Sequence, residues 1–281
     1  MEVSNEYRSA NADSARIAVL LNGGKFNLAP WIVGHFPTHL TYLEPFFGAG
    51  STLFFKPPCT IETVNDLDGR VVNFFRVLRN DADELIRHIK LTPWAREEYL
   101  LSLQQSDDPF EDARLFFMMC WMSMNGSTGT SPGSWRHRCD DQCQSPAVET
   151  LRVDHLYIIA ERLRLVQIEC RDALEVIPVY DRPEGLIYAD PPYVLSTRGG
   201  RYKFDVTDEF QTKLAALLRE CQSYVVVSGY PSEMYDKLYE GWTRVDKEDV
   251  QVNAGEKRTE CLWLSPRTVD ALSIPKQASL F

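Results

Sequence analysis

The stretch from Leu186 to Tyr193 limits the possible folds of this chain more than any other. A run of apolar or small residues, Leu186-Ile187-Tyr188-Ala189, leads directly into an acid, two prolines and an aromatic residue. Because proline has no N–H for a strand ladder, this pattern predicts a buried strand that stops with Asp190 at the sheet edge. Open α/β sheets bind their ligands at that edge. We therefore expect an α/β fold with a site at Asp190.

The four residues from Asp190 to Tyr193 allow only a narrow range of chemistry. The Asp190 carboxylate and the Pro191 carbonyl form a rigid set of hydrogen-bond acceptors, and Tyr193 adds a flat aromatic face. Such acceptors suit a planar amino group, because holding both of its hydrogens favours a pyramidal nitrogen with an available lone pair. Tyr193 is then placed to stack on the nucleobase that carries the amine. The alternative is a strand that Pro191 and Pro192 terminate, followed by a solvated acid.

Composition narrows the class of protein. With 281 residues, 44% of them hydrophobic, the chain can bury a large core, as one α/β domain with an insertion or as two domains. No apolar run approaches the roughly 20 residues that span a bilayer, and residues 1–11 lack the apolar core of a secretory signal. We expect a cytoplasmic protein with reduced thiols, because its seven scattered cysteines fit no disulfide framework. The net charge of -10 means that any binding to nucleic acid must come from a local basic patch.

A glycine-bearing turn follows the first predicted core strand, residues 40–44. The turn, Pro45-Phe46-Phe47-Gly48-Ala49-Gly50-Ser51, opens a short helix through Phe55. Its glycines let the backbone approach a bulky ligand closely, and a purely structural turn is the alternative. Further upstream, Gly23-Gly24-Lys25 also permits close approach and offers a cation to a carboxylate, although taken alone this tripeptide is usually just a turn.

Acids follow two further predicted strands. Asp66 comes after the strand over residues 61–64, where it can accept hydrogen bonds from ribose hydroxyls. Asp68 is better placed to cap the helix that follows. Asp172 comes after the strand over residues 165–170. It either accepts a hydrogen bond from the adenine amine of a cofactor or caps the next helix, and the two interpretations are equally good.

Residues 80–149 differ in character from the rest of the chain. Charged helical patterns over residues 83–90 and 93–104 precede an apolar stripe at helical spacing. The stripe indicates core rather than a ligand pocket, and its members are Phe110, Ala113, Phe117, Cys120, Trp121 and Met124. This segment is therefore predicted to be a helical insertion.

The loop over residues 125–138 contains no acid, and Trp135, Arg136 and Arg138 stand at its end. It is either a loop that contacts a phosphate backbone or a plain surface loop. No metal is expected, because a structural zinc site needs paired ligands and only three candidates stand together here, His137, Cys139 and Cys143.

The segment after Tyr193 carries three cations among glycines and aromatics, Arg198, Arg201 and Lys203. This composition suggests a loop that closes over an extruded nucleotide, and solvated surface charge is the alternative. The chain then returns to core elements. We expect a helix with an apolar face over residues 210–218, a buried strand over 223–228, and closing strands over 242–245 and 259–264 with a turn at 256–258.

Together these motifs resemble the amino-group DNA methyltransferases, in particular the adenine-specific enzymes of the Dam type. The resemblance is carried by Asp190-Pro191-Pro192-Tyr193, by Glu44-Pro45-Phe46-Phe47-Gly48-Ala49-Gly50-Ser51 and by Asn65-Asp66. It runs from Asn22 to about Pro266, since Asn22-Gly23-Gly24-Lys25-Phe26 and Lys257-Arg258-Thr259-Glu260-Cys261-Leu262-Trp263 also match. Only the middle insertion lacks sharp motifs.

The resemblance implies a Rossmann-like S-adenosylmethionine-dependent methyltransferase fold with a mixed, mostly parallel sheet and an inserted, largely helical region. It implies a catalytic core over residues 15–79 and 150–268, a DNA target-recognition region over 80–149, and flexible termini at 1–14 and 269–281. The implied reaction transfers a methyl group from S-adenosylmethionine to the exocyclic amine of an adenine flipped out of double-stranded DNA.

The same resemblance assigns residues to three roles. The catalytic motif is Asp190, Pro191, Pro192 and Tyr193. The cofactor residues are Gly24, Lys25, Glu44, Pro45, Phe46, Gly48, Gly50, Asp66, Asp172 and Asp190. The expected DNA contacts are Lys25, Trp135, Arg136, Arg138, Arg198, Arg201 and Lys203.

Other functions compete with this one. The amine of cytosine, an RNA or a protein side chain is an alternative target, although an acid at the start of the motif favours adenine. A non-catalytic DNA-binding relative would retain the fold, but candidate residues at every site count against it. A nicotinamide dehydrogenase lacks its full glycine fingerprint here. The sequence leaves open the recognised bases, a role in restriction, phage protection or regulation, and whether the protein is a monomer or a weak dimer.

Overall fold

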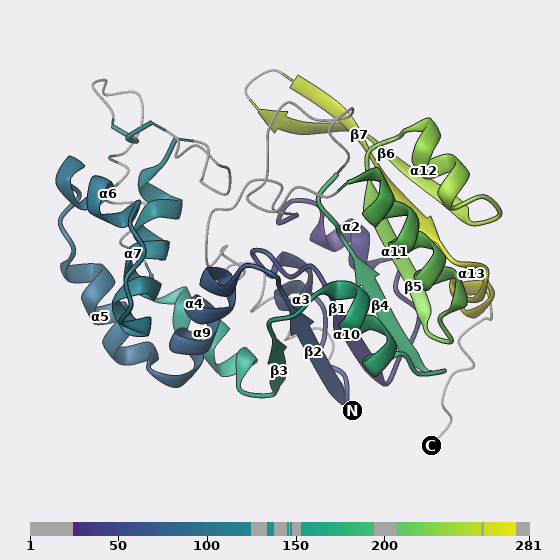
Figure 1. Cartoon of the computed structure of the whole chain (residues 1–281), viewed down its shortest axis with the longest axis horizontal. Helices are drawn as coiled ribbons and strands as arrows, with labels where there is room; N and C mark the ends of the chain where they lie inside the picture. The colour runs from purple at the N-terminus through teal and green to yellow at the C-terminus, as the bar shows by residue number, and fades with distance from the viewer. Residues whose placement is uncertain are drawn as a thin grey trace. The chain divides into compact units, whose positions relative to one another are not determined.

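The computed structural model of the chain describes residues 25–124, 134–137, 145, 147, 153–193, 207–253 and 256–273. Its contacts divide the chain into two compact units, and each is described by itself. Among the described residues, the first unit comprises 25–29, 48–57 and 68–170, and the second comprises 30–47, 58–67 and 171–273. Each unit therefore combines segments that are far apart in the sequence (Figure 1).

The second unit is built on a mixed sheet with the strand order β2-β1-β4-β5-β7-β6. Its strands are β1 (Thr41–Glu44), β2 (Ile61–Asn65), β4 (Gly185–Ala189), β5 (Tyr224–Gly229), β6 (Thr243–Asn253) and β7 (Glu256–Leu264). The first four pair in parallel, and β7 runs antiparallel to both β5 and β6. This topology confirms the predicted α/β fold with a mixed, mostly parallel sheet.

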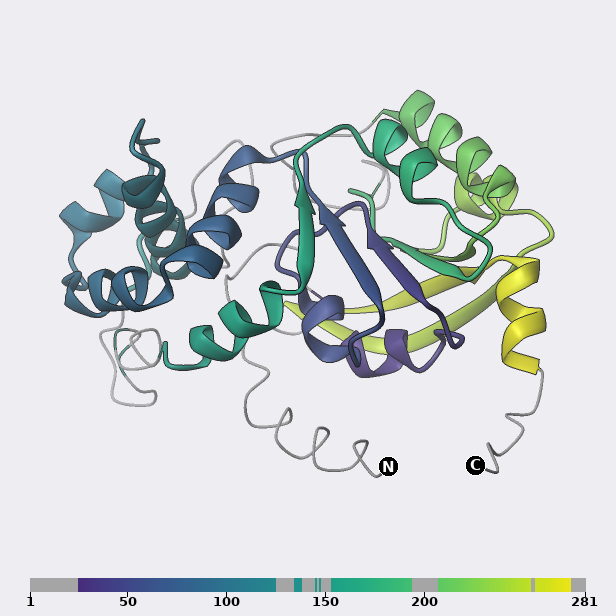
Figure 2. The same ribbon diagram turned by 90° about the horizontal axis from the view of Figure 1, so that it is seen from below.

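Helices cover both faces of this sheet (Figure 2). On one face, α10 (Ala173–Tyr180), α11 (Asp208–Glu220) and α12 (Glu233–Leu238) share an apolar core with β1, β4, β5 and β7. Figure 2 shows α2 (Ala29–Val33) and α13 (Pro266–Ser273) on the other face. Because successive strand residues point to opposite faces, Ile187 faces the first core while Tyr188 points the other way, to the Phe36 ring.

The first unit is mainly helical. Its elements are α3 (Ser51–Phe55), α4 (Gly69–Asn80), α5 (Ala82–Leu91), α6 (Arg96–Ser102), α7 (Pro109–Met122), α9 (His155–Leu163) and β3 (Val166–Glu169). The predicted apolar stripe lies on α7, where Phe117 and Cys120 are fully buried. Its interpretation as core is confirmed there, whereas Met124 lies beyond the helix and is 44% exposed. Among the described residues, none of the helices combines the length and apolar character that crossing a bilayer requires.

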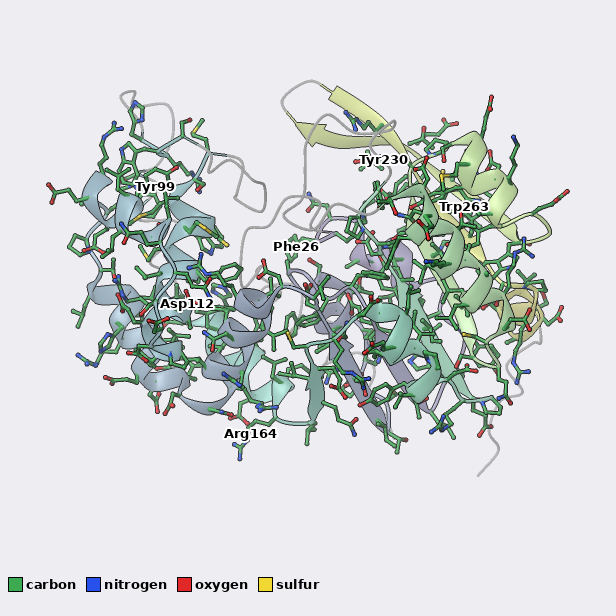
Figure 3. The ribbon with its side chains drawn as sticks, viewed as in Figure 1. Phe26, Tyr99, Asp112, Arg164, Tyr230 and Trp263 are labelled. Atoms are coloured by element: carbon green, nitrogen blue, oxygen red, sulfur yellow. The ribbon has the colours of Figure 1, made fainter. Side chains whose placement is uncertain are left out.

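A helix cap and a buried ion pair position helices of the first unit. Asp68 accepts a hydrogen bond from the Arg70 backbone N–H at 3.0 Å, and this cap begins α4 as predicted. The buried Arg70 Nε lies 3.0 Å from Asp112 Oδ1, which joins α4 to α7. Asp112 is labelled in Figure 3. A buried ion pair of this kind becomes costly when one partner is removed, because the other charge is then uncompensated.

The hairpin of β6 and β7 is longer than the sequence predicts. Strands were expected over residues 242–245 and 259–264, but they span Thr243–Asn253 and Glu256–Leu264, so the predicted turn at residues 256–258 is wrong. The register explains the error. Within the described residues, β7 pairs with β5 only over Cys261–Leu264, and its earlier half pairs with β6 alone. Residues 246–249 and 256–260 of these strands are charged or polar, so their pattern is that of a charged turn.

Candidate active site

The candidate site lies where parallel strands of the second unit end. The order β2-β1-β4 places the first strand between its two parallel neighbours, so the direction of the chain crossovers reverses between β1 and β4. Ligands of open α/β sheets bind outside the strand ends at such a switch point. The sequence predicts an acid at each of these ends, and the strands end at or directly before Glu44, Asp66 and Asp190.

Asp190 is held by hydroxyl groups from two elements. Ser228 Oγ on β5 donates to Asp190 Oδ1 at 2.7 Å, and the Tyr193 hydroxyl lies 3.0 Å from the same oxygen. Ser228 is in turn 3.1 Å from the hydroxyl of Tyr188 on β4. The structure therefore brings together the two ends of the Asp-Pro-Pro-Tyr motif and fixes the direction of the Asp190 carboxylate.

Both tyrosines of this network keep their protons at neutral pH. Burial raises the pKa of Tyr193 well above its ordinary value, and the negative charges of Asp190 and Glu260 raise it further. Burial is also the main reason why the pKa of Tyr188 is raised, with the Asp190 charge second. The phenols thus act as hydrogen-bond donors, which suits a network that ends on carboxylates.

The rest of the motif is packed from both sides. The Pro192 carbonyl accepts a hydrogen bond from Gln211 Nε2 of α11 at 2.8 Å. The Tyr193 ring is only 3% exposed and meets the Tyr230 ring edge-on, with centroids 4.6 Å apart. Tyr230, labelled in Figure 3, follows β5 and carries the Arg258 guanidinium over its face at 5.3 Å. Stacking of a base on Tyr193 stays a prediction.

Glu44 is a buried acid at the end of β1. It accepts a hydrogen bond from the Tyr42 hydroxyl at 2.8 Å. Burial raises the pKa of Tyr42 well above its ordinary value, and the neighbouring Glu44 charge adds to this. Glu44 is therefore oriented by its own strand, and contact with a ligand there stays a prediction.

The glycine turn after β1 has the backbone that the sequence suggests. Gly48 has φ 50° and Gly50 has φ 70°, a left-handed conformation that other residues adopt only with strain. A Cβ at Gly48 would meet nothing within 4 Å, so conformation rather than space requires this glycine. In the same turn Ser51 Oγ is buried without a hydrogen-bond partner among the described residues. Contact of this turn with a ligand stays a prediction.

The role of Asn65 was not predicted from the sequence, although the residue belongs to the Asn65-Asp66 motif. Its buried amide Nδ2 donates to the carbonyls of Pro45 and Arg171, both at 3.0 Å, and its Oδ1 accepts from the Arg171 N–H at 2.9 Å. One side chain thus links the segments after β1 and before α10. The only sequence signal was a polar residue at the end of an apolar strand.

The other predicted cofactor residues are placed as follows. Asp66 is half-buried directly after β2. Asp172 accepts from the Leu174 N–H at 2.8 Å and caps α10, which is the alternative interpretation of that residue. Phe46 is half-buried and meets the Phe210 ring. Lys25 is buried in the first unit, and Gly24 lies outside the described residues. Their contacts to a cofactor stay predictions.

Two predicted DNA contacts of the first unit, Trp135 and Arg136, pair through the backbone with the end of α7 and the residue after it. Ser123 and Trp135 form an antiparallel bridge, and the Arg136 N–H donates to the Met122 carbonyl at 2.7 Å. The Trp135 ring packs near Tyr99, labelled in Figure 3, with centroids 5.8 Å apart. Arg138, Arg198, Arg201 and Lys203 lie outside the described residues. Also outside them are Cys139 and Cys143, and the described residues hold no acid, histidine and cysteine cluster suited to a metal.

Comparisons with known proteins identify the family of this chain. A type II methyltransferase of Lactococcus lactis is 22% identical over 256 residues, which cover 83% of this chain and 88% of the relative. DNA adenine methylase of Escherichia coli is 23% identical over 224 residues, covering 74% and 76%. A SAM-dependent methyltransferase from Agrobacterium tumefaciens has a TM-score of 0.41 at 12% identity, covering 86% of this chain and 62% of that one. The model of one family matches residues 22–253, and the chain therefore belongs to the D12 class N6 adenine-specific DNA methyltransferases.

Proposed function

We propose that this protein is a site-specific DNA methyltransferase that acts on the N6 amine of an adenine turned out of the duplex. Family membership supports the reaction, and the geometry around Asp190 supports its place in the molecule. The observation that carries the proposal is the carboxylate of Asp190, fixed by Ser228 and Tyr193 at the end of β4. A carboxylate in that setting is an acceptor for both hydrogens of an exocyclic amine, together with the Pro191 carbonyl.

The chain contributes mainly positioning. Asp190 and the Pro191 carbonyl orient the amine so that its lone pair points at the methyl group, while the Tyr193 ring supports the base. When bound, S-adenosylmethionine supplies a methyl group that its sulfonium makes electrophilic. No side chain has to donate a proton to the leaving group, since the departing thioether is neutral. The nitrogen becomes positively charged as its bond to the methyl group forms, and it then loses one of its two protons by way of its hydrogen-bond acceptors to water. Holding two reactants in the right geometry can account for about 7–11 kcal/mol of barrier lowering.

The cofactor is proposed to lie along the ends of β1 and β2. Gly48 and Gly50 are also proposed contacts of the cofactor. Asp66 is the proposed ligand of the ribose hydroxyls, because an acid after the second strand takes that role in Rossmann-type sites. The remaining proposed contacts are Gly24, Lys25, Glu44, Pro45, Phe46, Asp172 and Asp190.

The methylation activity has a direct test. The protein is expressed in a host that lacks DNA methylation, and the host DNA is then sequenced for modified bases. We expect N6-methyladenine within one short sequence, and purified protein with labelled S-adenosylmethionine should mark the same sites in mixed-sequence DNA. Label on cytosine or RNA, or no label at all, would contradict the proposal.

Double-stranded DNA is the proposed partner, with Arg136 and Arg138 among its phosphate contacts. Replacing both with glutamine should weaken DNA binding and lower the slope of log Kobs against log salt concentration by about one unit per lost contact. Fluorescence anisotropy at several salt concentrations measures this slope. Replacing Arg87 and Arg164 instead removes the same charge from guanidiniums already paired with acids, and should leave the slope unchanged. Equal slopes in the two variants would assign this loop to plain surface.

The remaining proposals concern organisation. We take residues 80–149 as the target-recognition region and residues 15–79 and 150–268 as the catalytic core. The protein is proposed to be cytoplasmic, encoded by a bacterium or a phage, and a monomer or a weak dimer.

A further inference from the structure

The Tyr193 hydroxyl lies between two carboxylates. It is 3.0 Å from Asp190 Oδ1, and it also makes a short hydrogen bond to Glu260 Oε1 on β7. Tyr193 and Glu260 are 3% and 2% exposed, so neither group is open to bulk solvent. A phenol has one proton to donate, so at any moment only one of the two carboxylates receives it.

Asp190 Oδ1 has a second internal donor, the hydroxyl of Ser228 at 2.7 Å. When Tyr193 also donates to this oxygen, both of its lone-pair positions are taken by the protein. The other oxygen, Oδ2, still accepts hydrogen bonds, but two internal donors on Oδ1 leave the carboxylate with less negative charge to attract the hydrogens of an incoming amine. Engaging a substrate therefore favours release of the Tyr193 donor from Asp190.

Releasing that donor is costly unless the hydroxyl finds another acceptor. A buried hydroxyl left without a partner loses the free energy of its hydrogen bond to water with nothing in return. Glu260 supplies the acceptor at the right place. Lys247 on β6 lies directly opposite Glu260 in the strand register.

We propose that Glu260 is a positioning residue for methyl transfer, which takes over the Tyr193 hydroxyl when the target amine donates to Asp190. Glu260 does not touch the base in this scheme. It lets Asp190 exchange an internal donor for the substrate without leaving a buried hydroxyl unpaired. The inference rests on the proposed function and adds a residue outside the Asp-Pro-Pro-Tyr motif.

The scheme predicts a specific pattern of kinetics. Glu260→Leu fills a similar volume but accepts no hydrogen bond, so Tyr193 stays on Asp190 and kcat should fall about tenfold, the equivalent of one unmade buried hydrogen bond. Glu260→Gln keeps an amide oxygen as acceptor and should stay within about threefold of wild type. Affinity for S-adenosylmethionine, measured by calorimetry, should change by less than about twofold in both.

The decisive variant removes the competing hydroxyl. Tyr193→Phe keeps the ring but has no proton to place on either carboxylate. In the Glu260→Leu background it should restore most of the lost kcat, so that the double variant resembles Tyr193→Phe alone. A role of Glu260 in stability only would give losses that multiply, because nothing in that case depends on the hydroxyl.

Glu62 provides the matched control. It is also 2% exposed and lies on β2, on the other side of β1 and β4 from β7, where it accepts from the Cys59 N–H. Glu62→Leu removes a buried carboxylate of the same kind and should leave kcat within about twofold. If Glu260→Leu does not fold, as thermal unfolding would show, the cycle is run with Glu260→Ala, which also removes the acceptor and whose loss Tyr193→Phe should again restore.

The outcomes separate this inference from the proposed function. A wild-type protein with no methyl transfer would defeat the function itself. An active wild type in which Glu260→Leu loses nothing, or in which Tyr193→Phe restores nothing, would defeat only the role of Glu260.

Discussion

Replacing Asp190 with alanine is expected to lower kcat for adenine methylation by about a thousandfold. The affinity for S-adenosylmethionine should change little, because its other proposed contacts, Asp66 at the ribose among them, remain. The variant removes the proposed acceptor of the amine, and losing one pre-organised group at a reacting centre typically costs 10²–10³-fold, about 3–4 kcal/mol. Single-turnover methylation of duplex DNA and calorimetry with S-adenosylmethionine measure the two quantities. Near wild-type turnover would remove Asp190 from the mechanism.

Asp66→Ala is the matched control for that experiment. Both side chains are half-buried acids directly after a parallel strand, but Asp66 follows β2 and is assigned to the cofactor ribose. We expect this variant to weaken the affinity for S-adenosylmethionine by about tenfold, the value of one hydrogen bond to a charged group. At saturating cofactor its kcat should recover. If the two variants lost the same property, the assignment of separate roles would be wrong.

The second large effect is on stability. Gly229 ends β5, and a Cβ there would lie 2.4 Å from Tyr235 Cε2 and 3.1 Å from Trp263 Cζ3. Tyr235 cannot easily move aside, because its buried ring packs against Trp263, labelled in Figure 3, with centroids 5.2 Å apart. Gly229→Ala should therefore destabilise the second unit by about 2 kcal/mol, the usual cost of overpacking a core. Denaturant unfolding followed by near-ultraviolet circular dichroism measures this value.

Gly69 offers the comparison for the glycine prediction. It begins α4, and a Cβ there would meet nothing within 4 Å. Gly69→Ala should leave stability unchanged or raise it by about 0.5 kcal/mol, because alanine restricts the unfolded chain and suits a helix. A loss of similar size in both variants would mean that the contact with Tyr235 is not the cause.

Much of the fold could be predicted because its local patterns are strong. Apolar runs that end in acids marked β1, β2 and β4, since buried parallel strands have no polar face to hide the signal. Asp190 and Tyr193 were also within reach, because one rigid tetrapeptide brings them together. The outer part of the β6 and β7 hairpin could not be predicted. Its residues 246–249 and 256–260 are charged or polar on both faces of the strands, so they lack the alternation of apolar and polar residues that marks a strand.

The residues that complete the site come from elsewhere in the chain. Three of them contact the motif from other elements: Ser228 from β5, Gln211 from α11 and Glu260 from β7. Contacts between residues so far apart in the sequence cannot be predicted from a local pattern. The only sequence signal of such a residue is that it is polar at a buried position of an otherwise apolar element. Pairing across a sheet depends on register, and register depends on the whole fold.

The Asn65 side chain fixes the segment after β1 to the segment before α10. Since its amide group joins the carbonyl of Pro45 to both backbone groups of Arg171, neither segment can shift alone without breaking hydrogen bonds in a buried setting. Both segments are therefore already ordered in the folded protein before any ligand binds. Any ligand that bound there would meet a preset surface and would lose little affinity to the entropy of ordering these segments.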